Sequence, residues 1–261
     1  MTLSILAHSA RAGFADYAVM FTPAMWMLGW LTRVFAQVTF FALIGQLLGS
    51  QEQVRFLLIG SVVLIAVMHT MATAASTTAE RGLGTLPLLV AAPATHVTVF
   101  LGRGLCWMVS GVVSSTVALA VVAPLFGVAL PWPRVLLFAP LMLLVAATTY
   151  LFATFLASLL LRMLAIRSVI THLAWLLLTA FCGVMVPVTF WPLWIQRAAE
   201  VLPLTHGLSA IRALLDGAPL DTLIPLVAAE AAVGIGWLLL AVIGFHQFVE
   251  SGRRDGSLEF T

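Results

Sequence analysis

The sequence predicts an all-α polytopic membrane protein with six transmembrane helices. The first observation is composition: the chain is 62% hydrophobic and only 8% charged, with a mean hydropathy of +1.12. A soluble fold of 261 residues could not bury so much apolar surface. The second observation is that uninterrupted apolar runs of about 20 residues, the length that crosses a bilayer as a helix, recur along the chain.

Six apolar runs are candidate spans, and an N-terminal segment of mixed character precedes them. Residues 1–30 combine charged side chains with Phe and Trp, and Pro23 interrupts them, which is typical of an interfacial helix leading into the first span. The six runs are Leu31–Leu48, Phe56–Ala79, Leu105–Gly127, Val135–Leu161, Ser168–Pro187 and Leu223–Phe248.

Basic residues orient these spans. Eight arginines fall on one side of the predicted membrane and four on the other, which favours the first side as cytoplasmic and places both termini there. All twelve basic residues are Arg, and with abundant Ala and Gly this favours a GC-rich bacterial genome. We therefore expect a multi-pass protein of the bacterial plasma (inner) membrane. The four outer arginines are Arg55, Arg134, Arg197 and Arg212.

The inner connection at residues 80–96 is too polar and too broken to be a span. Glu80 and Arg81 precede two glycines and a short Leu-rich stretch that Pro93 ends. Thr85 is suited to cap a short helix. Such a helix would be either a knob that a soluble partner grips or an amphipathic loop lying on lipid, and spacing alone leaves both open.

The outer connection at residues 188–222 is long but still apolar, with aromatics such as Trp194. Irregular backbone at membrane depth is tolerated where protein or a wet cavity covers it, so we expect a re-entrant segment that caps an internal path. Within it, Pro203 sets a turn and Thr205 is expected to cap a helix beginning near His206.

Two charged residues in the outer half are candidate path residues. Glu230 lies seven residues into the last span, about 10 Å below its outer end. An acid at that depth indicates either a functional site or polar packing against a neighbouring helix. Arg212 would contact phosphate headgroups, Asp216 or an amphipathic cargo, or would be an interfacial arginine paired locally.

The inner and outer connections together resemble one known family. The inner segment is similar to the E-R-E-x-G-T-L-E-x-L-L-x-x-P element of the ABC-2 family of ABC exporter permeases, with Gly82 and Pro87 in place of two glutamates. The outer segment resembles the family's G-x-x-x-P … P-x-W … L-P-L-T … R … G stretch. The matching inner residues are Glu80, Arg81, Gly84, Thr85, Leu86, Leu89 and Pro93. The matching outer residues include Gly183, Pro187, Pro192, Trp194, Pro203, Thr205, Arg212 and Gly217.

The resemblance implies that residues 1–261 form a single ABC-2 type transmembrane domain. It implies that the inner residues form a coupling helix, pushed by two copies of an ABC ATPase that bind ATP and Mg, and that a second permease half completes the transporter. The cargo would be a hydrophobic or amphipathic small molecule, as in drug and antibiotic efflux, or a lipid or lipid-linked polysaccharide. The substrate path and outer gate would include Trp194, Pro203, Thr205, His206, Arg212 and Glu230.

Other functional classes are weaker expectations. The chain contains no Lys, so it lacks the lysine of a P-loop and we expect no ATPase site of its own. A rhomboid-like hydrolase would pair Ser209 with His246, which is expected about 35 Å away at the other end of the last span. A scaffold or channel remains an alternative. We expect no nucleic-acid partner, no metal site and two packing cysteines, Cys106 and Cys182.

Overall fold

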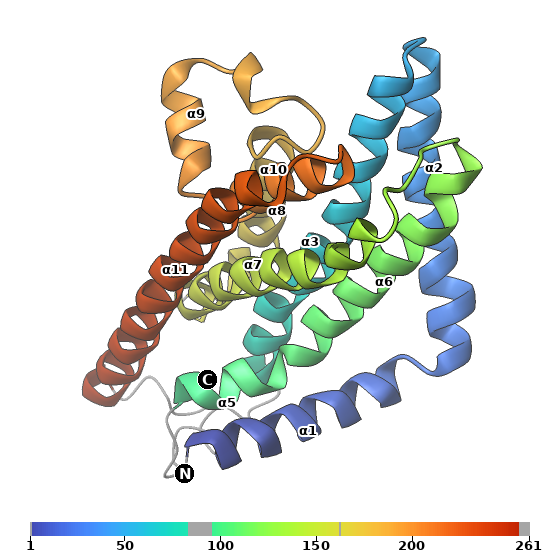
Figure 1. Ribbon diagram of the computed structural model, residues 1–261. Helices are drawn as coiled ribbons and strands as arrows, with labels where there is room; N and C mark the ends of the chain where they lie inside the picture. The colour runs from blue at the N-terminus through green and yellow to red at the C-terminus, as the bar shows by residue number, and fades with distance from the viewer. Residues whose placement is uncertain (1, 83–95, 162, 256–261) are drawn as a thin grey trace.

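A computed structural model describes residues 2–82, 96–161 and 163–255 (Figure 1). Every regular element in these ranges is a helix. Five helices are long and apolar enough to cross a membrane: Met25–Leu47, Gln51–Ala74, Thr98–Leu125, Arg134–Leu160 and Leu220–Phe248. The predicted all-helical class with several spans is confirmed.

The N-terminal segment is bent just before Pro23. Helix α1 (Thr2–Met20) lies across one end of the bundle beside α5 (His96–Arg103), to which the Asp16–Arg103 ion pair of 2.7 Å joins it (Figure 1). The first span then begins at the π-helical turn η1 (Met25–Leu31), six residues before the expected Leu31. Proline has no N–H to continue a helix, so the chain changes direction there.

The first span continues into α2 (Thr32–Leu47), which packs on the central helix α3 (Gln51–Gly82). At 32 residues α3 is about 48 Å long, more than a bilayer's apolar thickness. It also contacts α6 (Leu105–Leu125), where a Cβ on Gly111 would lie 3.0 Å from the Ala66 carbonyl oxygen.

Small residues draw α6 and α3 together, as in other membrane helix pairs. Gly111, Ser114, Ser115 and Ala118 are all buried, and the Ser115 hydroxyl donates a 2.8 Å hydrogen bond to the Val62 carbonyl.

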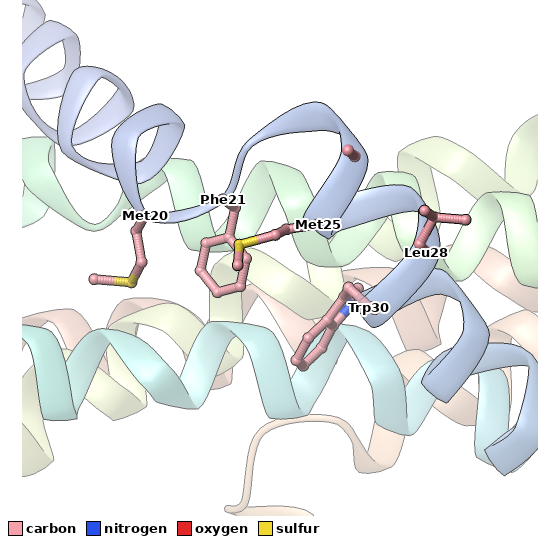
Figure 2. A pocket seen from close by; sticks show the side chains of 7 residues that line it. Met20, Phe21, Met25, Leu28 and Trp30 are labelled. Carbon is pink, nitrogen blue, oxygen red and sulfur yellow. The ribbon is translucent and has the colours of Figure 1, made fainter.

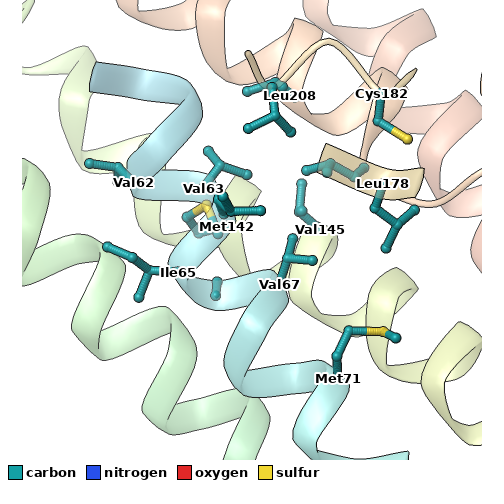
Figure 3. Packing of buried hydrophobic residues seen from close by; sticks show 14 of the residues in the cluster. Val62, Val63, Ile65, Val67, Met71, Met142, Val145, Leu178, Cys182 and Leu208 are labelled. Carbon is teal, nitrogen blue, oxygen red and sulfur yellow. The ribbon is translucent and has the colours of Figure 1, made fainter. Parts of the chain in front are cut away.

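The fourth and last spans form the most extensive pair. A single 3-10 turn, η2 (Arg134–Leu137), leads into α7 (Phe138–Leu160), which packs along α11 (Leu220–Asp255). Figure 3 shows the core beside them, where Val63 and Val67 of α3 lie next to Met142 and Val145 of α7.

The expected fifth span is shorter than its apolar run. After the turn η3 (Leu164–Ile166), α8 (Arg167–Phe181) has 15 residues, about 22 Å, and the chain turns at Gly183, whose φ is +84°. Glycine at this position ends a helix because it adopts the left-handed conformation without strain. Helix α8 thus falls below the length of the other five spans, and a sixth crossing stays a prediction.

Three short helices follow α8 at the end of the bundle opposite α1 (Figure 1). They are η4 (Val188–Phe190), the exposed α9 (Leu193–Glu200) and the largely buried α10 (Thr205–Leu215). Helix α10 contacts α3, α7 and α11, so this part of the outer connection is integrated into the bundle.

Candidate functional site: the α10 junction

Charged side chains from separate parts of the chain converge on the short helix α10. We call this set the α10 junction. It comprises Arg55 of α3, Arg134 of η2, Glu230 of α11, and Leu204, Gly207 and Arg212 of α10 and its cap.

The N-terminal end of α10 is capped by Glu230. This carboxylate is fully buried, with 0% of the residue exposed. It accepts the backbone N–H of Leu204 at 2.9 Å and that of Gly207 at 2.8 Å. Helix N-termini present unpaired N–H groups and a partial positive charge, so a buried carboxylate is well matched there. Glu230 therefore attaches α10 to α11.

The backbone around this cap is tightly fitted. Leu204, the residue before α10, has a φ of +90°, and its side chain is fully buried. A Cβ added to Gly207 would overlap the Cγ2 methyl of Val145 on α7 and lie 3.2 Å from the Glu230 carboxyl carbon. Glycine at 207 is what allows α10, α7 and the carboxylate to meet.

Thr205 does not cap α10 as its position suggested. Its hydroxyl donates a 2.6 Å hydrogen bond to the Ala199 carbonyl at the end of α9, and His206 Nε2 lies 3.1 Å from the Glu200 carbonyl oxygen. Glu230 takes the capping role because it reaches both free N–H groups from α11. Thr205 and His206 instead hold α9 against the start of α10.

Arg212 fastens the middle of α10 to the end of α8. Its guanidinium donates to the carbonyls of Gly183 at 2.7 Å and Val184 at 3.3 Å, and its central carbon lies 3.7 Å from the ring centroid of Phe56 on α3. Helix α10 lies outside the five candidate spans. Burial lowers the pKa of Arg212 to about 10, so the side chain stays charged at neutral pH.

Two further arginines hold the C-terminal end of α10. Arg55 donates to the Leu215 carbonyl and pairs with Asp216 at 3.0 Å. Arg134 donates to the Gly217 carbonyl at 2.8 Å. Cations are favourable at a helix C-terminus, where carbonyl groups lack partners. Opposite charges therefore stabilise the two ends of one short helix.

The junction joins four parts of the bundle through one rigid element. Glu230 belongs to α11, Arg55 to α3 and Arg134 to the turn before α7, while Arg212 contacts the chain that leaves α8. A displacement of any of these elements must break one of these hydrogen bonds or move α10 with it. The arrangement is suited to mechanical coupling.

The other outer candidates are spread around this core. Pro203 is buried just before α10, whereas Trp194 on α9 is 72% exposed. Arg55 and Arg134 were not candidate site residues in the sequence. Their positions could have indicated a role, because each directly precedes an apolar run on the predicted outer side of the membrane.

The predicted coupling residues fall at the limit of the described chain. Glu80 and Arg81 belong to the last turn of α3, so that end of the segment is an extension of the second span. Gly84, Thr85, Leu86, Leu89 and Pro93 lie outside the described residues.

The geometry does not support the hydrolase alternative. The Ser209 hydroxyl donates to the Thr205 carbonyl at 2.9 Å within its own helix. His246 lies near the far end of α11, where its Nδ1 is 3.7 Å from Glu250. Across the ranges that the structure describes, no group of three His, Cys, Asp or Glu side chains could hold a metal ion.

Comparison with known families agrees with this architecture. A family described as ABC-2 type transporter matches residues 20–215, three quarters of the chain. The protein belongs to the ABC-2 type transporter family. No curated protein and no solved structure matches it.

This ABC-2 protein is therefore a multi-pass membrane protein of an ABC permease type. Domains of this kind are transmembrane components without an ATPase site of their own, in agreement with the absence of Lys from the chain. The matched range ends at Leu215, the last residue of α10, so it includes most of the junction but not α11.

Proposed function

We propose that this chain is the permease subunit of an ATP-driven exporter. It would move a hydrophobic or amphipathic small molecule, of drug or antibiotic type, out of the cytoplasm or the inner leaflet. Two copies of an ABC ATPase, which carry ATP and Mg, would drive it through residues 80–96, and a second permease half would complete the path. Family membership supports the transport role.

The observation that carries the proposal is the α10 junction. A short helix whose two ends are bound by opposite charges from different spans transmits movement of α3 to α11 and α7. Helix α3 also continues to Gly82, at the start of the proposed coupling segment. One helix thus connects the proposed site of the ATPase push with the proposed outer gate.

The proposed orientation follows the same axis. The described ends of α1 and α11 lie at one end of the bundle and α10 at the other (Figure 1). We place the first end in the cytoplasm of a bacterial cell, because eight of the twelve arginines are predicted there. The α10 junction then faces the outer leaflet.

The first test is whether an ATPase binds the inner segment. The tagged chain is purified from native membranes in mild detergent, as wild type and as Leu89→Arg, with Leu220→Arg at the start of α11 as the matched control. We expect a P-loop ATPase to co-purify with wild type and with Leu220→Arg, but not with Leu89→Arg. An ATPase-free wild-type chain would instead favour the scaffold or channel.

The second test measures transport. The complex is reconstituted in vesicles, and ATP-dependent movement of a panel of amphipathic fluorescent dyes is compared with that of a fluorescent lipid. We expect dye transport that requires ATP and is lost in Glu230→Leu, while ATPase co-purification is retained. Movement of the lipid alone would assign the chain to the lipid-exporting alternative.

A further inference from the structure

A second candidate site lies at the opposite end of the bundle from the α10 junction. The bend between α1 and the first span forms an open apolar hollow of about 490 Å³ (Figure 2). This volume falls within the range of small-molecule sites in proteins. The hollow is lined by Met20, Phe21, Ala24, Met25, Leu28, Gly29 and Trp30.

The local sequence explains why the hollow exists. Helix α1 ends at Met20, and the chain is helical again from Pro23, which leads into the π-helical turn η1. A Cβ added to Gly29 would meet nothing within 4 Å, so the absence of a side chain there leaves space open. Leu28 remains 76% exposed at the edge.

The two aromatic residues that line the hollow, Phe21 and Trp30, pack against rings of neighbouring helices. The ring centroids of Phe21 and Trp30 are 6.4 Å apart. The ring centroids of Phe21 and Trp107 of α6 are 5.8 Å apart. Those of Trp30 and the buried His69 of α3 are 4.2 Å apart, in an edge-to-face arrangement. These contacts join this aromatic wall to two spans, α6 and α3.

A cation lies beside this wall. The exposed Arg33 follows Trp30 by three residues, and its guanidinium carbon is 5.3 Å from the Trp30 ring centroid. None of the ion pairs found among the described residues involves Arg33. Asp16 is the sole acid from residue 2 to 47, and Arg103 neutralises it. Residues 2–47, which include the whole lining of the hollow, therefore carry a net positive charge.

We propose that the hollow binds one acyl chain of an anionic bilayer phospholipid, whose headgroup Arg33 holds. The hollow opens beside α1, which lies across the end of the bundle where the spans would leave the apolar layer (Figure 1). Phospholipid surrounds such a position, and juxtamembrane arginines attract anionic headgroups. The apolar lining matches the acyl chain, and Arg33, which forms no ion pair with any described residue, matches the anionic headgroup.

The experiment counts lipids that remain bound to the full chain. Wild type is reconstituted in equal parts phosphatidylglycerol and phosphatidylcholine, extracted and examined by native mass spectrometry. Two variants remove one half of the site each: Arg33→Gln removes the charge, and Gly29→Leu fills the hollow. Their matched controls are Arg167→Gln, an exposed arginine on α8, and Gly236→Leu, since a Cβ at 236 also meets nothing within 4 Å.

We expect wild type and both controls to retain one phosphatidylglycerol more tightly than phosphatidylcholine. Arg33→Gln should weaken its retention about fivefold, the effect of one arginine near a headgroup. Gly29→Leu should abolish it. Brominated phosphatidylglycerol should also quench tryptophan fluorescence in wild type more than in Trp30→Phe, which provides a measurement for any variant that folds poorly.

Several outcomes would overturn this proposal. One is equal retention of the two lipids by wild type. Another is unchanged phosphatidylglycerol retention in both Arg33→Gln and Gly29→Leu. If Gly29→Leu changes the oligomeric state but not the lipid count, a second copy of the chain covers the hollow instead. None of these results depends on an ATPase, so the proposed transport function is tested separately.

Discussion

The α10 junction and the hollow at the α1 bend use opposite means to organise the two ends of the bundle. At the junction, the buried carboxylate of Glu230, the partly exposed Arg55 and the exposed Arg134 contact backbone groups at the two ends of one short helix. Arg212 of the same helix contacts the backbone that follows α8. At the hollow, apolar side chains are exposed and the cation Arg33 has no carboxylate partner in the described chain. The junction depends on defined geometry, whereas the hollow tolerates any apolar surface of similar shape.

This difference has an energetic origin. A buried polar group that loses its partner costs about 1–3 kcal/mol, so substitutions at the junction should be costly. An exposed apolar side chain loses little when replaced by another of similar volume. If the comparison is correct, the effects of substitutions should fall steeply from the junction to the hollow.

The largest effect is expected for Glu230→Leu. It leaves the N–H groups of Leu204 and Gly207 buried without an acceptor, and the free energy of unfolding should fall by about 2–6 kcal/mol. Glu230→Gln keeps one acceptor oxygen and should lose clearly less. Denaturant unfolding of the purified chain in detergent measures both. Equal stability of wild type and Glu230→Leu would contradict the assigned role of this carboxylate.

The next effect is expected for Gly207→Ala. Its new methyl group would overlap Val145, so we expect a loss of about 1–3 kcal/mol in stability. Adding Val145→Ala creates space, and the double variant should be more stable than the sum of the two single changes indicates. The same unfolding assay gives the coupling energy. Strict additivity would show that α10 and α7 are not in contact there.

A smaller effect is expected for Tyr17→Phe beside the hollow. The Tyr17 hydroxyl is 2.6 Å from Ser110 Oγ and joins α1 to α6. Its removal should cost about 1 kcal/mol, because Ser110 keeps a contact with the Trp26 N–H. Ser110→Ala is the matched change on the other side of the bond. A loss as large as that of Glu230→Leu would remove the contrast between the two ends.

The smallest effect is expected for Met25→Leu in the wall of the hollow. Met25 is 63% exposed, and leucine has a similar volume, so stability should change by less than about 0.5 kcal/mol. Thermal unfolding in detergent is sufficient to test it. A loss above about 2 kcal/mol would show that the hollow is as closely fitted as the junction.

Local patterns predicted much of the fold. Five apolar runs correspond to helices of spanning length, and the small residues of α6 face α3. Both patterns depend on neighbours three or four residues apart. The pattern failed at the fifth run. Helix α8 stops at Phe181, the chain turns at Gly183, and the carbonyls of Gly183 and Val184 accept hydrogen bonds from the distant Arg212.

The candidate site was predicted less completely. The depth of Glu230 in an apolar run indicates either a functional site or polar packing, and the sequence alone does not favour one over the other. Its partners, Leu204 and Gly207, are more than twenty residues away, and Arg55 reaches Leu215 across 160 residues. Spacing carries no information about such contacts, so Thr205 was assigned the capping role that Glu230 has.

By itself, the sequence determined that this protein lies in lipid and where its apolar spans fall. It also determined the small-residue packing faces and the positions of the few charges along the chain. These properties follow from hydrophobic burial and helical periodicity, which act over a few turns. Tertiary structure alone decided which charges meet: Glu230 at the start of α10, Arg55 and Arg134 at its end, and Arg33 beside an apolar hollow. The physical reason is that a charged group pairs with whatever lies near it in space, whatever the separation along the chain, and a buried one such as Glu230 must do so.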